Sequence, residues 1–168
     1  MKKLILTIAI VLGISQFVNA QTEVGVGITE GSNSYSSIAI EAKANFGVTD
    51  KIAISPSIDY FIPTNSIVND YLGVDDGVGL LMTISVDGHY AFPINDKFEA
   101  YGIAGLNFLL SNVDDNSYYW DYYDFGPKLF VNVGGGATYA FSDKMKAYLE
   151  IKFSRFVPTA TAGILFSL

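Results

Sequence analysis

The stretch Met145-Lys146-Ala147-Tyr148-Leu149-Glu150-Ile151-Lys152-Phe153 alternates apolar and polar side chains without a break. Successive side chains of a β-strand point to opposite faces, so this alternation predicts a strand with one apolar and one polar face. Lys146, Glu150 and Lys152 all fall on the same face. Because the charged residues all lie on one face, the strand is predicted to separate an apolar environment from a polar one.

The same alternation recurs along the chain. Glu41 and Lys43 share one face of their segment, and Asp87 and His89 share one face of theirs. No stretch keeps a helical period, and we expect an all-β fold. Pro56 falls on an apolar face and lacks a backbone donor, so we expect a bulge or an interrupted pairing there. The predicted strands span residues 22–30, 36–48, 52–62, 77–92, 97–110, 129–141, 145–156 and 159–168.

Three short turns are predicted at repeated Asp-Lys pairs, each of which closely follows a phenylalanine: Asp50-Lys51, Asp96-Lys97 and Asp143-Lys144. The other connections lie near residues 31–35, 63–76, 111–128 and 157–158, and two of them are long. Short turns therefore occupy one end of the predicted sheet and the longer loops the other end. This asymmetry is typical of outer-membrane barrels.

The composition indicates that the apolar face points outward. Half of the 168 residues are hydrophobic, only 16% are charged, and the mean hydropathy is +0.32. An average soluble domain carries about 25% charged residues. Glycine, alanine and serine are frequent on the polar face, and they suit the narrow interior of an eight-stranded barrel. A soluble, lipocalin-like binder, with its apolar face inside, is the alternative fold.

Charge and cysteine content exclude several function classes. The net charge is −7, which argues against nucleic-acid binding because such proteins present a basic face. The chain has no cysteine, so disulfides and thiolate metal sites are excluded. We expect no cofactor and no metal.

The first twenty residues have the layout of a secretory signal peptide. A basic start at Lys2 and Lys3 precedes an apolar run from Leu4 to Gly13, and small residues end at Ala20. The apolar run is shorter than the roughly 20 residues that a membrane-spanning helix needs. We therefore expect a signal peptide over 1–20 and a single barrel domain over 21–168.

The chain resembles the small eight-stranded outer-membrane barrels, the group of OmpX, OmpW and the OmpA membrane domain. The resemblance is carried by the eight alternating strands and by turn segments such as Ala44–Lys51 and Tyr139–Lys144. It implies an eight-stranded antiparallel up-and-down transmembrane barrel in the outer membrane of a diderm (Gram-negative) bacterium.

The resemblance also implies partners. They are outer-membrane lipids including lipopolysaccharide, and, during biogenesis, the barrel-assembly machinery and periplasmic chaperones. The last strand of the family usually ends in an aromatic residue that this machinery recognises. In this chain the outward-facing Phe166 lies two positions before the terminal Leu168.

Ionisable side chains on the polar face are predicted to lie inside the barrel. Buried charges must be paired or hydrated, so we expect either a network that plugs the lumen or a narrow path for small solutes or ions. Glu23 shares this face, and the predicted network consists of Glu41, Lys43, Asp59, Asp87, His89, Glu99, Lys146, Glu150 and Lys152.

His89 raises the further alternative of a lipid-modifying enzyme. It is the only histidine, and Ser85 and Asp87 share its face. Catalytic groups of such an enzyme need a location that lipid can reach, and the sequence shows no nucleophile motif. We therefore favour a non-enzymatic protein.

The connection 111–128 mixes aromatic and acidic residues. Tyrosine and tryptophan are enriched in protein interfaces, so this loop predicts contact with an extracellular protein or surface. The alternatives are an aromatic belt at the lipid headgroups or a ribbon that extends two strands beyond the membrane. The candidate contact residues are Asp114, Asp115, Tyr118, Tyr119, Trp120, Asp121, Tyr122, Tyr123 and Asp124.

Overall fold

A computed structural model describes residues 22–31, 37–62, 78–113, 128–154 and 158–168. The predicted signal peptide lies outside these residues. The described chain consists of eight strands and contains no helix long and apolar enough to cross a membrane. The strands are β1 (Thr22–Gly31), β2 (Ser37–Gly47), β3 (Ile52–Ile62), β4 (Val78–Pro93), β5 (Phe98–Val113), β6 (Lys128–Ser142), β7 (Met145–Ser154) and β8 (Pro158–Ser167).

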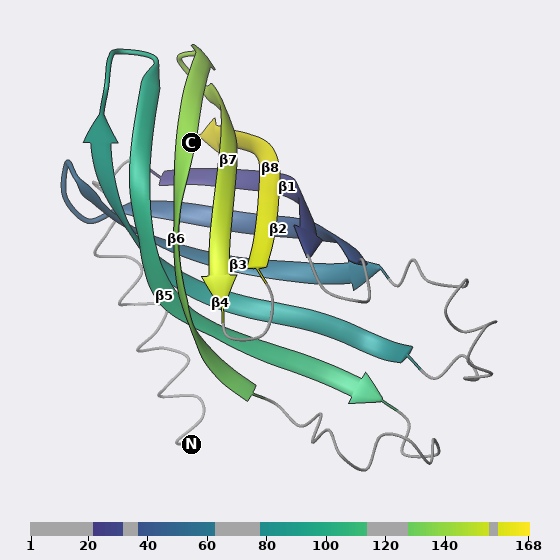
Figure 1. Cartoon of the computed structure of the whole chain (residues 1–168). Helices are drawn as coiled ribbons and strands as arrows, with labels where there is room; N and C mark the ends of the chain where they lie inside the picture. The colour runs from purple at the N-terminus through teal and green to yellow at the C-terminus, as the bar shows by residue number, and fades with distance from the viewer. Residues whose placement is uncertain (1–21, 32–36, 63–77, 114–127, 155–157) are drawn as a thin grey trace, which may run out of the picture.

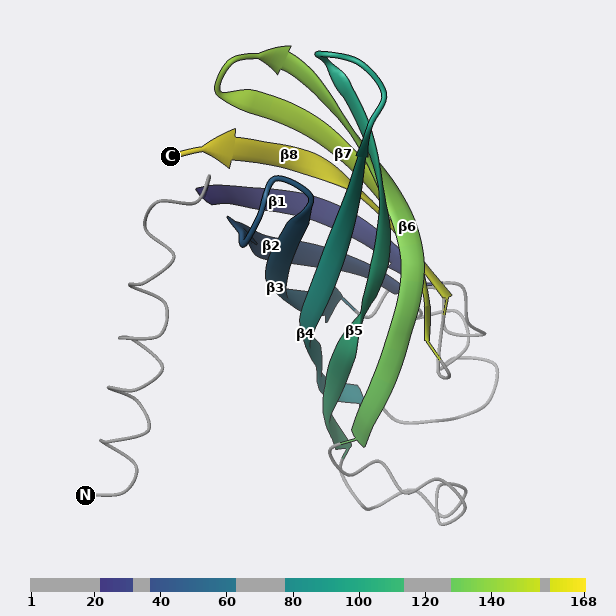
Figure 2. The same ribbon diagram turned by 90° about the vertical axis from the view of Figure 1, so that its left-hand side faces the viewer.

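Each strand pairs antiparallel with its neighbour in sequence, and β1 pairs with β8 to close the barrel (Figures 1 and 2). The closing ladder runs from Glu23↔Ser167 to Gly31↔Thr159. Closure leaves no open sheet edge, so backbone donors and acceptors meet one another around the ring. The predicted eight-stranded antiparallel barrel is confirmed.

The three Asp-Lys turns share one local device. The side chain of the residue before each aspartate accepts a hydrogen bond from the backbone N–H group two positions later, and in two of the three turns also from the one three positions later, as in Asx and ST turns. Asn95 Oδ1 accepts from the N–H groups of Lys97 and Phe98, at 3.0 and 2.9 Å. Thr49 Oγ1 does the same for Lys51 and Ile52, and Ser142 Oγ accepts from Lys144. We call this end of the barrel the turn end and the opposite end the loop end.

Two strands are longer than the alternation predicted. β5 continues to Val113 and β6 begins at Lys128, so the ends of the predicted 111–128 connection belong to strands. Backbone pairing with β4 explains the extension, because Ser111 is opposite Leu81 and Val113 is opposite Val78. β7 is described from Met145 to Ser154, and the last two positions of the predicted strand, 155 and 156, lie outside the described residues.

Pro56 interrupts the pairing of β2 with β3, as the sequence predicted. Lys43↔Ser57 and Phe46↔Ile54 are paired, but the two positions between them are not. The missing pairs are Ala44 with Pro56 and Asn45 with Ser55, while Pro56 still pairs with Val86 on the other side. The proline has no N–H to donate, so the ladder fails at this point.

Apolar side chains face outward and polar ones inward. Ile40 and Ile151 expose 54% and 47% of their surface, whereas their neighbours Glu41 and Lys152 expose 0% and 6%. Aromatic residues on the outer face include Tyr60, Tyr90, Phe92, Tyr139, Phe141 and Phe166. This is the reverse of a soluble barrel and fits a lipid surround.

Two inward tyrosines fill much of the interior, and glycines opposite them make room. A Cβ at Gly136 would lie 2.6 Å from the Tyr101 ring, and one at Gly163 would lie 2.5 Å from the Tyr148 ring. Real Cβ contacts are longer, so a side chain at either position would displace the ring. The small residues of the polar face thus permit the close packing of an eight-stranded interior.

Placing a charge on the outer face should be costly. Ile151→Arg is expected to destabilise the barrel by about 2–4 kcal/mol, because a cation near the bilayer midplane loses its hydration. Unfolding of the protein in urea in lipid vesicles measures the effect. Ile94→Arg is the matched control, since Ile94 lies in the β4–β5 turn and a charge at that end meets water. Equal stability of the two variants would contradict a lipid-facing Ile151.

Candidate functional site

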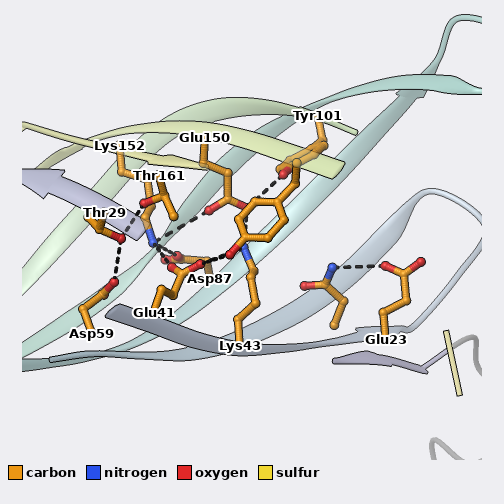
Figure 3. A network of polar contacts seen from close by, with 12 residues as sticks. Glu23, Thr29, Glu41, Lys43, Asp59, Asp87, Tyr101, Glu150, Lys152 and Thr161 are labelled. Atoms are coloured by element: carbon orange, nitrogen blue, oxygen red, sulfur yellow. Dashed lines mark hydrogen bonds and ion pairs between the residues drawn. The ribbon is translucent and has the colours of Figure 1, made fainter. Parts of the chain in front are cut away.

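Two lysines and three carboxylates form ion pairs in the middle of the barrel (Figure 3). The Lys43 ammonium group pairs with Glu150 on the far side of the lumen. The Lys152 Nζ atom lies 3.6 Å from Glu41 Oε2, 3.4 Å from Asp87 Oδ2 and 3.9 Å from Glu150 Oε2. All five side chains are buried. Each charge therefore has a compensating charge close by, which buried ionised groups require.

Tyrosine hydroxyls complete the coordination of two of these carboxylates. Tyr101 donates a hydrogen bond of 2.8 Å to Glu150 Oε1, and Tyr148 donates one of 2.7 Å to Glu41 Oε1. The Lys43 Nζ atom also lies 4.7 Å from the centre of the Tyr148 ring, a cation–π distance. The two hydroxyls thus bind the two carboxylates, and the Tyr148 ring also contacts the Lys43 ammonium group.

A second group of contacts surrounds Asp59, which has no lysine partner among the described residues. Thr29 and Thr83 donate to its two carboxylate oxygens at 3.0 and 2.9 Å. Thr161 lies in turn within 2.8 Å of the Thr29 hydroxyl. The Asp59 carboxylate is therefore stabilised by hydroxyl donors, whereas Glu41, Asp87 and Glu150 are stabilised by lysine ammonium groups.

Every strand contributes a side chain to these contacts. Asn132 of β6 donates to Asp87 at 3.0 Å, and the other seven strands supply the residues already described. Together the contacts join opposite walls of the barrel, as from Lys43 on β2 to Glu150 on β7. We call the whole set the lumen network. It consists of Thr29, Glu41, Lys43, Asp59, Thr83, Asp87, Tyr101, Asn132, Tyr148, Glu150, Lys152 and Thr161.

Of the site residues predicted from sequence, the structure brings Glu41, Lys43, Asp59, Asp87, Glu150 and Lys152 together in the lumen network. Lys146 lies apart at the turn end, where it pairs with Glu23 at 2.7 Å and keeps 27% of its side chain exposed. Glu99 is half-buried near the start of β5. Within the described residues it forms no ion pair.

His89 lies in the interior but does not form a catalytic triad. Its ring stacks on Tyr101 with a centroid distance of 4.7 Å. Neither His89 Nε2 nor Ser85 Oγ has a hydrogen-bond partner, while Asp87 is held by Asn132 and Lys152. A serine nucleophile needs a hydrogen bond to its base, and this pair lacks one. Among the described residues, no three acidic or histidine side chains gather as metal ligands.

The neutral members of the lumen network were not among the residues predicted from the sequence. Tyr148 shares its face with Glu150, and Tyr101 shares its face with Glu99, so the parity of these positions was a usable signal. The threonines and Asn132 gave no comparable signal, because short polar residues are common on any inward face. The loop candidates Asp114 to Asp124 lie outside the described residues.

Breaking the central ion pair should destabilise the barrel strongly. We expect Lys43→Met to cost about 3–5 kcal/mol, because it leaves Glu150 buried without its nearest cation. The double variant Lys43→Met/Glu150→Gln should recover part of this loss. Lys146→Met is the control, since its pair is partly exposed and should cost at most about 1 kcal/mol. Urea unfolding in lipid vesicles measures all three, and equal losses for Lys43→Met and Lys146→Met would contradict this account.

Comparisons with known proteins agree with this fold. No curated protein matches the sequence. Among solved structures, the N-terminal barrel domain of Pseudomonas aeruginosa OprF has a TM-score of 0.61 and 18% identity, over 89% of this chain and 98% of that one. Ail of Yersinia pestis has a TM-score of 0.57 and 13% sequence identity, over 89% of this chain and 99% of that one. Neisserial surface protein A has a TM-score of 0.58 and 12% sequence identity, over 88% of this chain and 96% of that one. At these identities the likeness establishes the fold alone.

The match to a protein family extends over most of the sequence. The outer membrane protein beta-barrel domain family matches residues 6–162. This range includes nearly all of the eight strands that form the closed barrel. The chain therefore belongs to the outer membrane protein beta-barrel domain family, whose members reside in the outer membrane of Gram-negative bacteria.

Proposed function

We propose that this protein is a non-enzymatic barrel that carries binding loops on the bacterial surface and does not transport solutes through its lumen. The observation that supports this is the lumen network, in which side chains from all eight strands meet across the interior. Ion pairs between opposite walls oppose the passage of a hydrated solute, because each must open to let it pass. A barrel closed in this way leaves its loops as the functional surface.

In this proposal the turn end lies in the periplasm and the loop end lies outside the cell. Short periplasmic turns and longer outer loops are the rule for such barrels. The chain would be exported by the signal peptide over 1–20 and inserted by the barrel-assembly machinery with the help of periplasmic chaperones. Lipopolysaccharide would then surround the outer half of the barrel.

The proposed ligand is a protein surface with basic character. The connections 63–77 and 114–127 contain seven aspartates and no lysine or arginine. Strands β3 to β6 deliver both connections to the loop end (Figure 1). Ail has been solved with the heparin analogue sucrose octasulfate. A polyanion of that kind would be repelled by the aspartates of this chain, so we propose the opposite charge for its partner.

The aromatic residues of the longest loop should carry the affinity. Replacing Tyr118, Tyr119, Trp120, Tyr122 and Tyr123 with serine is expected to abolish attachment of barrel-bearing vesicles to an immobilised basic protein, because interface energy concentrates in such side chains. Replacing the four loop aspartates with asparagine should instead slow association and remove its salt dependence. Unchanged attachment by the aromatic variant would contradict the role of this loop.

A conductance measurement tests the closed lumen directly. The purified protein in a planar lipid bilayer should give no steady single-channel current, because the lumen network joins opposite walls. The insertion control is heat-modifiable gel migration of the same sample, which reports a folded barrel. A sustained, cation-selective current from folded protein would replace this proposal with the alternative of a minor channel for small solutes or ions.

A further inference from the structure

Among the described residues, most of the buried neutral side-chain atoms without a hydrogen-bond partner lie on one wall of the lumen. Asn45 Oδ1, Ser55 Oγ, Ser57 Oγ, Ser85 Oγ and His89 Nε2 are buried and have no hydrogen-bond partner. They all lie on β2, β3 and β4, which are consecutive neighbours in the barrel. We call these five residues the serine–histidine patch. A sixth such neutral atom, Asn132 Oδ1, lies beside Asp87, which borders the patch.

The strand register makes the patch continuous. Ser57 is opposite Ser85, and Ser55 is opposite Asp87. Asn45 and Ser55 do not pair, but the pairs Lys43↔Ser57 and Phe46↔Ile54 flank them in the ladder. Asn45 therefore lies opposite Ser55. Cβ atoms of residues directly opposite on antiparallel strands lie about 4.5–5.5 Å apart. The serine side chains are short, and their hydroxyls do not reach one another or Asp87 in the structure.

The β2–β3 ladder of the same wall is also interrupted. The unpaired positions Ala44 and Pro56, and Asn45 and Ser55, lie within this part of the β2–β3 ladder. The adjoining wall, formed by β1 and β8, is packed differently. There the Tyr148 ring approaches Gly27 and Gly163, and the Leu165 side chain approaches Gly25, so that a Cβ at any of the three glycines would clash.

Buried polar groups in proteins are paired with protein or with ordered water. Several adjacent unpaired groups in one wall are therefore evidence for an occupant that can both donate and accept hydrogen bonds. A buried water molecule typically makes about three hydrogen bonds and needs polar partners on several sides, which this patch provides.

We propose that the serine–histidine patch is a binding site for ordered water, fed from the turn end of the barrel. Asn45 connects the patch to that end, because its amide donates to Glu23. Glu23 in turn pairs with Lys146, which is partly exposed. The water column ends at Asp87, which Lys152 and Asn132 hold. The water therefore lies along β2, β3 and β4, between Asn45 and Asp87.

Serine-to-alanine variants test the proposal because the two alternatives predict opposite signs. If water satisfies the Ser85 hydroxyl, Ser85→Ala removes a hydrogen bond and should lower the folding equilibrium constant by about three- to tenfold. If the site is dry, the same change removes an unpaired buried hydroxyl and should raise that constant. Ser55→Ala should behave in the same way, and urea unfolding in lipid vesicles measures both.

Two controls and one direct observation complete the experiment. Thr29→Val removes a hydroxyl that binds Asp59 directly and should lower stability under either alternative. Ser167→Ala, at the turn end of β8, should change nothing. A crystal structure of the protein should then show ordered water within hydrogen-bonding distance of Ser85 Oγ and His89 Nε2. A more stable Ser85→Ala protein, or an interior without water at these atoms, overturns the proposal.

Discussion

Peptide groups in hydrocarbon have no water to bind, and the fold follows from this constraint. A sheet of this chain can satisfy its backbone only by joining its first strand to its last, as β1 and β8 do. Closure then fixes which face is enclosed, because the apolar residues must meet lipid. The β2–β3 ladder is interrupted only at Pro56 and the neighbouring pair, so the departure from full backbone pairing between these strands is local.

Closure around eight strands leaves little interior space, and this space is filled mainly by polar side chains. Two tyrosine rings fit only because glycines face them. Their hydroxyls donate hydrogen bonds to Glu41 and Glu150. These bonds add to the ion pairs that the two carboxylates form with the lysines. Packing and electrostatics are therefore linked, because the rings that fill the lumen also carry the hydroxyls that bind the buried carboxylates.

The interior carries more acid than base among its described residues. Glu41, Asp59, Asp87 and Glu150 face two lysines, Lys43 and Lys152. Hydrogen bonds from threonine, tyrosine and asparagine stabilise the excess negative charge. Such an interior suits a rigid cross-linked scaffold, because moving one strand would separate charges from their partners. A rigid barrel is in turn a suitable support for loops that contact other surfaces, which is the role that we propose.

Strand order, strand direction and the inward or outward position of each side chain were all determined by the sequence. Alternation has a period of two residues, and Glu150 and Lys152 could not share a face with Ile151 in any strand. The Asp-Lys turns likewise follow from local hydrogen bonds of Thr49, Asn95 and Ser142. Only the tertiary structure decided which charges meet. Lys43 pairs with Glu150 because closure and register bring β2 and β7 to the same level, and no local pattern encodes that distance across the lumen.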